Sequence, residues 1–186
     1  MRGLEDGELV VRSQEGDTRA FAELVERYKG MVFTMIYRIL GDRSEAEDVA
    51  QDVFIRAYKA LPRFRREAKF STWLYRICHN LCLTRAIKQR REVTYRSEMR
   101  GEENSVEAAY ERREVQEKVR ELISELPPIY RTAITLRHIQ GLSYKEISEI
   151  LGQPLGTTKS TILRAREQLK KLALERIGWD VIRGVL

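Results

Sequence analysis

Apolar residues recur every three or four positions over most of the chain, which is the spacing of amphipathic helices. The first stripe predicts a helix that begins after Asp17, a good N-cap residue, and ends at Gly41. Its apolar positions are Phe21, Leu24, Val25, Tyr28, Val32, Met35, Ile36 and Ile39. A second stripe, from Ala46 to Leu61, predicts another helix that Pro62 ends.

A third helix is predicted after the polar, basic segment 63–69, which has the composition of a loop. Ser71 or Thr72 would cap this helix, and its apolar side would carry Trp73, Leu74, Ile77, Cys78, Leu81 and Cys82. The same helix would run into segment 85–91, which holds four basic residues and no acidic one.

The helical pattern stops in the polar segment 92–108, which has few large apolar residues. We therefore predict three parts, 1–91, the linker 92–108 and 109–186. Because no segment alternates as a β-strand does, the predicted fold is all-α, with two small helical bundles joined by a flexible linker.

The second bundle contains a predicted helix-turn-helix. A short helix over 129–139 precedes a helix that Ser143 caps, with Glu146 at the capping-box position. Residues 152–156 form the expected turn, where Gly152 supplies backbone freedom, and a long helix follows from Thr157 to about residue 177. That last helix would bury Thr158, Ile162, Ala165 and Leu169 and expose Lys159, Ser160, Leu163 and Arg164.

Charge placement favours DNA as the partner of this motif. The net charge of +6 is a weak signal alone, but residues 159–176 hold six basic residues and two acidic ones. In a helix-turn-helix, the second helix lies in the major groove. A catalytic role is not expected, because only two histidines are present and no phosphate-binding loop or nucleophile motif appears.

The two cysteines, Cys78 and Cys82, lie four residues apart on one predicted helix and indicate no disulfide framework. With His79 they could be taken for metal ligands, but three ligands on one helix rarely close a tetrahedral site. We therefore expect buried thiols, no metal and no cofactor. The chain start is not a signal peptide, and no apolar run is long enough to span a membrane, so membrane insertion is not expected.

Several motifs resemble those of extracytoplasmic-function (ECF) sigma factors of bacterial RNA polymerase. Residues 48–58 (DVAQDVFIRAY), Phe64, 70–77 (FSTWLYRI) and 80–81 (NL) resemble region 2 of that family. Residues 126–131 (LPPIYR), 141–147 (GLSYKEI) and 155–160 (LGTTKS) resemble region 4. The resemblance extends from Ala20 to Leu172. It implies a cytoplasmic, non-enzymatic subunit that directs promoter-specific transcription, with core RNA polymerase (β′ and β subunits), promoter DNA and an anti-sigma factor as partners.

The resemblance also implies a role for each matching position. The pocket for a base of the −10 element would be formed by Ala60, Phe64, Ile77 and Asn80. Loop and strand contacts at the −10 element would come from Arg65, Arg66, Lys69, Phe70, Trp73 and Tyr75. A strip along the DNA backbone would be Arg85, Lys88, Arg90 and Arg91. The −35 recognition helix would use Thr157, Thr158, Lys159, Ser160, Leu163, Arg164 and Arg166. Core polymerase would bind Asp48, Gln51, Asp52 and Phe54.

Two positions depart from the family pattern. Thr158 replaces a larger branched apolar residue, and Leu163 stands where an aromatic or basic residue is frequent, so the −35 preference stays open. A rival interpretation is a regulator that binds duplex DNA as a dimer without polymerase. Such a regulator would have a ligand pocket or dimer interface in the first bundle, and would not need the aromatic and basic helix from Phe70 to Arg91. The apolar tail 178–186 would pack on the last helix or meet a partner.

Overall fold

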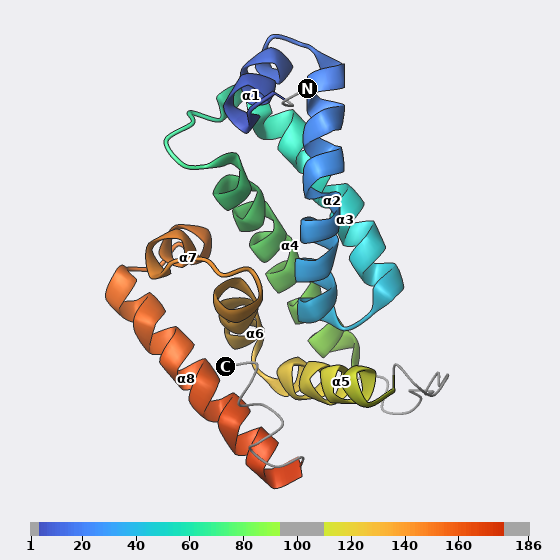
Figure 1. Cartoon of the computed structure of the whole chain (residues 1–186), viewed down its shortest axis with the longest axis vertical. Coiled ribbons are helices and arrows are strands. Elements are labelled where there is room, and N and C mark those ends of the chain that lie inside the picture. The colour runs from blue at the N-terminus through green and yellow to red at the C-terminus, as the bar shows by residue number, and fades with distance from the viewer. Residues whose placement is uncertain (1–3, 94–109, 177–186) are drawn as a thin grey trace.

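The computed structural model describes residues 4–93 and 110–176, and the side chains of 4–87 and 118–176. All regular elements within these ranges are helical, which confirms the all-α prediction (Figure 1). The predicted linker 92–108 and the tail 178–186 lie almost entirely outside the described residues.

The first unit, residues 4–93, is a bundle of three long helices preceded by a short one. It comprises α1 (Asp6–Gln14), α2 (Thr18–Leu40), α3 (Arg43–Ala60), the 3-10 turn η1 (Leu61–Arg63) and α4 (Phe70–Val93). The Asp17 carboxylate accepts hydrogen bonds from the amides of Arg19 (2.9 Å) and Ala20 (3.2 Å), which confirms the predicted cap of α2. Gly41 ends α2 with φ of 80°, a left-handed conformation that favours glycine.

Two boundaries in this unit differ from the sequence prediction. Helix α1 was not predicted, because its nine residues bury only Leu9 and Val10 as large apolar side chains, too few to show a stripe. Helix α4 begins at Phe70, so Ser71 and Thr72 lie inside its first turn. The Thr72 side chain is buried at 4% exposure and packs inside the protein.

The second unit, residues 110–176, contains the predicted helix-turn-helix. Its elements are α5 (Tyr110–Glu125), α6 (Pro128–Ile134), the π-helical turn η2 (Thr135–Ile139), α7 (Tyr144–Leu151) and α8 (Leu155–Arg176). The capping box of Ser143 and Glu146 and the left-handed Gly152 (φ 63°) are both confirmed. Helix α8 begins two residues earlier than predicted, because the carbonyl of Pro154 already accepts the Thr158 amide hydrogen at 2.9 Å.

The two units pack directly on one another, which the sequence pattern did not indicate. Helix α7 lies beside α4, and α6 lies between α8 and the α2–α4 pair (Figure 1). Buried side chains of the second unit, namely Ala133, Leu136, Ile147, Ile150 and Ile162, belong to the same apolar core as Ile36, Leu74 and Cys78. Arg131 adds a hydrogen bond from its guanidinium to the Ile39 carbonyl at 2.7 Å. A smaller core joins α5, α6 and α8.

No described helix is both long and apolar enough to cross a membrane.

Candidate nucleic-acid interface

The residues predicted to hold a −10 base lie at the end of α3 and along one side of α4. Ala60, the last residue of α3, is exposed, and Phe64 follows the η1 turn. Trp73, Ile77 and Asn80 are spaced by four and three residues, so they share one face of α4. The Phe64 ring stacks on Trp73 with centroids 4.7 Å apart, which joins the turn to that face. Asn80 is exposed and Ile77 is half-buried.

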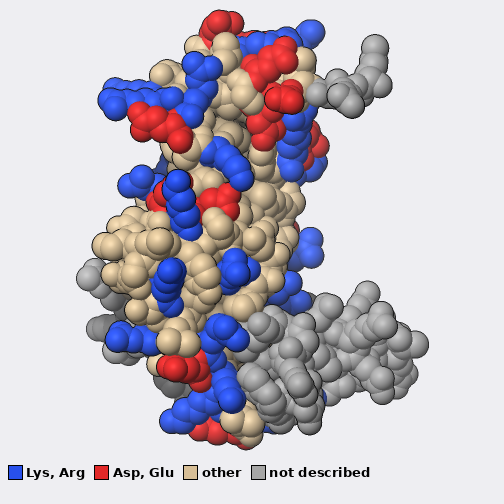
Figure 2. All heavy atoms as spheres, turned by 60° about the vertical axis from the view of Figure 1, so that its left-hand side comes forward, with Lys and Arg blue, Asp and Glu red and all other residues tan. Residues whose placement is uncertain are grey.

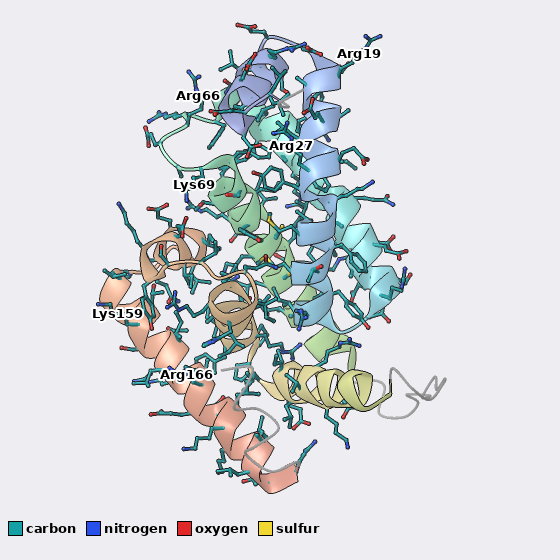
Figure 3. The ribbon with its side chains drawn as sticks, in the orientation of Figure 1. Arg19, Arg27, Arg66, Lys69, Lys159 and Arg166 are labelled. Atoms are coloured by element: carbon teal, nitrogen blue, oxygen red, sulfur yellow. The ribbon has the colours of Figure 1, made fainter. Side chains whose placement is uncertain are left out.

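The loop between η1 and α4 carries the exposed cations predicted to contact the −10 strand. Arg65, Arg66 and Lys69 are all exposed, and Figure 3 shows Arg66 on this loop, away from the helices. Arg66 has φ of 61°, the left-handed region that side chains other than glycine rarely adopt. Phe70, in contrast, is buried at 5% exposure and packs edge-on against Tyr28 and Phe64.

Two of the predicted −10 contacts are engaged by the second unit. The Tyr75 ring is buried, and its hydroxyl donates a hydrogen bond of 2.7 Å to the Gln140 side-chain oxygen. Lys69, which Figure 3 shows just before α4, forms an ion pair of 2.9 Å with Glu146 of α7. The Lys69 ammonium and the hydrogen bonds from Ser143 lower the pKa of Glu146 to about 2, and the same ion pair raises the pKa of Lys69.

A buried histidine lies on the same side of α4. His79 is 3% exposed, and its Nδ1 lies 3.4 Å from the Thr132 hydroxyl of α6. Burial lowers the pKa of His79 to about 4, so the ring is neutral at pH 7. The prediction of buried thiols is confirmed: Cys78 and Cys82 are both buried and free, and burial raises their pKa. Within the described residues, no three His, Cys, Asp or Glu side chains are grouped to hold a metal ion.

The predicted backbone strip is only partly described. Arg85 is half-buried on α4. Lys88, Arg90 and Arg91 lie in the same helix, but their side chains are outside the described residues.

Helix α8 presents most of the predicted −35 residues to solvent. Thr157, Lys159, Ser160, Arg164 and Arg166 are exposed, and Leu163 is 56% exposed, unusually high for leucine. Figure 3 labels Lys159 and Arg166 along α8, and basic side chains predominate over the lower part of the face in Figure 2, where α8 lies. Thr158 differs from the rest: it is fully buried, and its hydroxyl donates to the Pro154 carbonyl at 3.2 Å.

The predicted polymerase-binding residues lie on α3. Asp48 and Gln51 are exposed, Asp52 is half-buried, and Phe54 packs partly against the core. Ile55 (51% exposed) and Tyr58 (46% exposed) share their face, and sequence reasoning missed both. The sequence feature that could have identified them is their spacing, because positions 48, 51, 55 and 58 lie on one side of a helix.

Comparisons with known proteins agree with this geometry. The family model described as Sigma-70 region 2 matches residues 24–92, and Sigma-70, region 4 matches residues 116–169. Curated relatives include RNA polymerase sigma-H factor of Pseudomonas aeruginosa, 39% identical over 90% of this chain and 93% of the relative. ECF RNA polymerase sigma factor SigW of Bacillus subtilis is 41% identical over 85% of this chain and 91% of its own length.

Two solved structures share the arrangement of the helices over most of the chain. CnrH, solved in complex with the cytosolic domain of CnrY, is 27% identical with a TM-score of 0.70, covering 92% of this chain and 98% of CnrH. The sigma factor RpoE of Bartonella quintana, solved with the anti-sigma factor NepR, is 25% identical with a TM-score of 0.67, covering 84% of this chain and 98% of RpoE. The chain therefore belongs to the extracytoplasmic-function sigma factors of bacterial RNA polymerase, with region 2 in its first unit and region 4 in its second.

Proposed function

We propose that this chain brings core RNA polymerase to a set of promoters by contacting the −35 and −10 elements with its second and first units. The observation that carries the proposal is the pair of exposed faces, the basic outer side of α8 and the Ile77–Asn80 side of α4, in a chain with both sigma regions. The chain supplies binding groups only; the polymerase performs the chemistry, in the cytoplasm, and the chain is not itself an enzyme.

At the −35 element, α8 enters the major groove of the duplex. Arg164 donates to guanine, Ser160 contacts base edges, and Leu163 offers an apolar contact for a thymine methyl group. Lys159 and Arg166 neutralise phosphates, which orients the helix and makes binding salt-dependent. Thr158 is buried, so it fixes the turn before the helix and does not read bases.

At the −10 element, one base of the non-template strand leaves the stack and is held beside Asn80, whose amide offers both a donor and an acceptor to the base edge. Phe64, Ile77 and Ala60 provide the apolar surroundings. Arg65, Arg66 and the Arg85–Arg91 strip follow the phosphates of the opened strand. Phe70 is buried and supports the loop from below.

Lys69 and Tyr75 join the −10 contacts only after the two units separate, because in the described arrangement Glu146 and Gln140 engage them. The Trp73 ring stacks against Phe64 and supports the apolar surroundings of the base. Separation also lets the units contact two promoter elements that lie far apart on DNA.

The exposed face of α3 docks on core polymerase, with Asp48, Gln51 and Asp52 as acceptors for a coiled coil of the β′ subunit. Region 4 meets the β subunit. An anti-sigma factor controls the chain, as the complex of RpoE with the anti-sigma factor NepR supports by similarity.

In vitro transcription tests this function. The purified chain and sigma-free core polymerase are mixed with fragmented genomic DNA, and transcript 5′ ends are mapped. Discrete starts that share two upstream motifs, and that are strongly reduced with Asn80→Ala or Lys159→Glu, are expected. If another sigma factor supports transcription in the same mixture but this chain gives no starts, the proposal fails. A dimer that binds a palindrome without polymerase would favour the rival regulator.

A further inference from the structure

The residue at the C-terminal end of α1 makes an unusual contact with the turn that carries Phe64. Gln14 ends the helix, and its side-chain amide nitrogen donates to the carbonyls of Leu61 and Phe64, both at 2.9 Å. An amide nitrogen has two N–H donors, and here each has its own acceptor. The contact joins residues 47 and 50 positions apart, so it depends on how α1 folds back onto the turn.

The carbonyls that Gln14 binds belong to the short turn that joins α3 to the exposed loop. Residues 61–63 form a single 3-10 turn, in which the Phe64 amide donates to the Leu61 carbonyl at 3.0 Å. The Leu61 carbonyl therefore accepts from both the Phe64 amide and Gln14, and the Phe64 carbonyl accepts from Gln14. A Gln14 amide that binds both carbonyls at once fixes the path of the backbone where it leaves α3 and enters the exposed loop.

Helix α1 is itself firmly placed, so it can act as a support. Leu9 and Val10 are each 1% exposed and belong to the main core. Asp6 forms an ion pair of 3.0 Å with Arg27 of α2 and accepts a hydrogen bond from the Tyr28 hydroxyl. Arg12 pairs with Asp17, the N-cap of α2, at 2.6 Å.

Phe64 is therefore held from two sides. Its carbonyl is bound by Gln14 from α1, and its ring stacks on Trp73 of α4 at 4.7 Å. Because the Phe64 side chain and the loop from Arg65 to Lys69 start from this backbone, the position of the turn determines where the aromatic wall of the −10 site stands.

We propose that Gln14 is a positioning residue for base capture at the −10 element, which makes α1 part of the promoter-opening machinery. This inference rests on the proposed function. It assigns a role to a helix that lies before residue 24, where the match to sigma region 2 begins. Gln14 touches no DNA in this scheme; it acts through Phe64.

Two variants of Gln14 and one of its neighbour separate the loss of the donors from a change in side-chain size. Gln14→Met keeps the length of the side chain and removes both donors. Gln14→Lys keeps a side chain of similar reach that can still donate to both carbonyls, because an ammonium group has three N–H donors. Glu15→Met changes the exposed neighbouring residue and serves as the matched control.

The test compares these variants as holoenzymes on the promoter mapped by the transcription experiment. Promoter opening is measured as the rate at which unpaired thymines become reactive to permanganate. Two control measurements use binding to core polymerase and binding of the holoenzyme to a duplex that ends upstream of the −10 element. Thermal unfolding of each free chain completes the set.

We expect Gln14→Met to open the promoter about tenfold more slowly, which corresponds to about 1.4 kcal/mol, the scale of one or two net hydrogen bonds. Core binding and −35 binding should be unchanged, and Gln14→Lys and Glu15→Met should open the promoter as the parent chain does. Opening by Gln14→Met at the parent rate overturns the inference. So does an equal loss of opening, −35 binding and core binding, since that result reports general destabilisation. If the parent chain gives no starts at all, the proposed function itself has failed.

Discussion

Protonation of His79 should loosen the contact between the two units. The ring is buried between α4 and α6, and burial lowers its pKa from 6.5 to about 4. The Thr132 hydroxyl donates its hydrogen to the Pro128 carbonyl at 3.1 Å, so it acts as an acceptor toward His79. The neutral His79 ring therefore carries its hydrogen on Nδ1. Burial alone disfavours the charged imidazolium, so folding and docking favour the neutral ring and acid should oppose them.

The sign and size of the effect follow from linkage between protonation and folding. Because the pKa in the folded chain is depressed, the stabilisation is fully present above pH 6.5 and is lost as the pH falls from 6.5 towards 4. Each pKa unit corresponds to about 1.4 kcal/mol, so the full loss below pH 4 is about 3 kcal/mol. At pH 5.5, about 1 kcal/mol should already be lost. Glu146 contributes little at pH 5.5, because its pKa falls from 4.5 to about 2 on folding and its stabilisation is lost only as the pH falls from about 4.5.

The assay is urea unfolding at pH 7.0, 6.0 and 5.5, with His79→Gln as the variant that cannot titrate. The parent chain should lose about 1 kcal/mol more than His79→Gln between pH 7.0 and 5.5. The other histidine, His138, also has a lowered pKa but is present in both proteins, so its contribution cancels. Equal pH slopes in the two proteins would refute the reasoning.

Four further outcomes are expected. Asn80→Ala should reduce promoter opening by about tenfold, measured by permanganate reactivity, while binding of the −35 duplex stays constant. Lys159→Glu should weaken binding to all duplexes and flatten the dependence of log K on log salt by about one unit or more, measured by fluorescence anisotropy. Ile36→Ala, at a fully buried position, should reduce the free energy of unfolding by about 2–5 kcal/mol in urea. Tyr58→Ala should weaken binding to core polymerase and lower the melting temperature only slightly, because the side chain is 46% exposed and its ring packs edge-on against the Phe21 ring, with centroids 5.0 Å apart.

Elements with long apolar stripes and strong end signals could be predicted from the sequence. Helix α2 combines an aspartate cap with a terminal glycine, and α7 has a full capping box, so both were placed with their ends. Helix α1 was missed because packing against α2 and η1 stabilises it, and that packing does not leave a periodic pattern in nine residues. The start of α8 was misplaced because Pro154 and Gly156 have the composition of a turn although they lie at a helix start.

The candidate site was predictable only in its outward-facing parts. The exposed residues of α8 and α3 follow from helical spacing once the buried side is known. Tyr75 bonds to Gln140, just after η2, and Lys69 pairs with Glu146 of α7, and both partners are more than sixty residues away in sequence. Such contacts require the relative position of two units, and periodicity within each unit carries no information about that position.

The contact between the units also sets the apparent affinity of this chain for promoters. If the docked form cannot engage both promoter elements, the apparent promoter affinity equals the intrinsic affinity multiplied by the fraction of undocked chain. Each 1.4 kcal/mol of docking free energy then lowers that affinity tenfold. A partner that binds the separated units more tightly than the docked units raises the affinity for promoter DNA by some factor. By reciprocity, promoter DNA raises the affinity for that partner by the same factor. The ion pair of Lys69 with Glu146 and the hydrogen bond of Tyr75 to Gln140 thus act on the threshold concentration at which promoters become occupied.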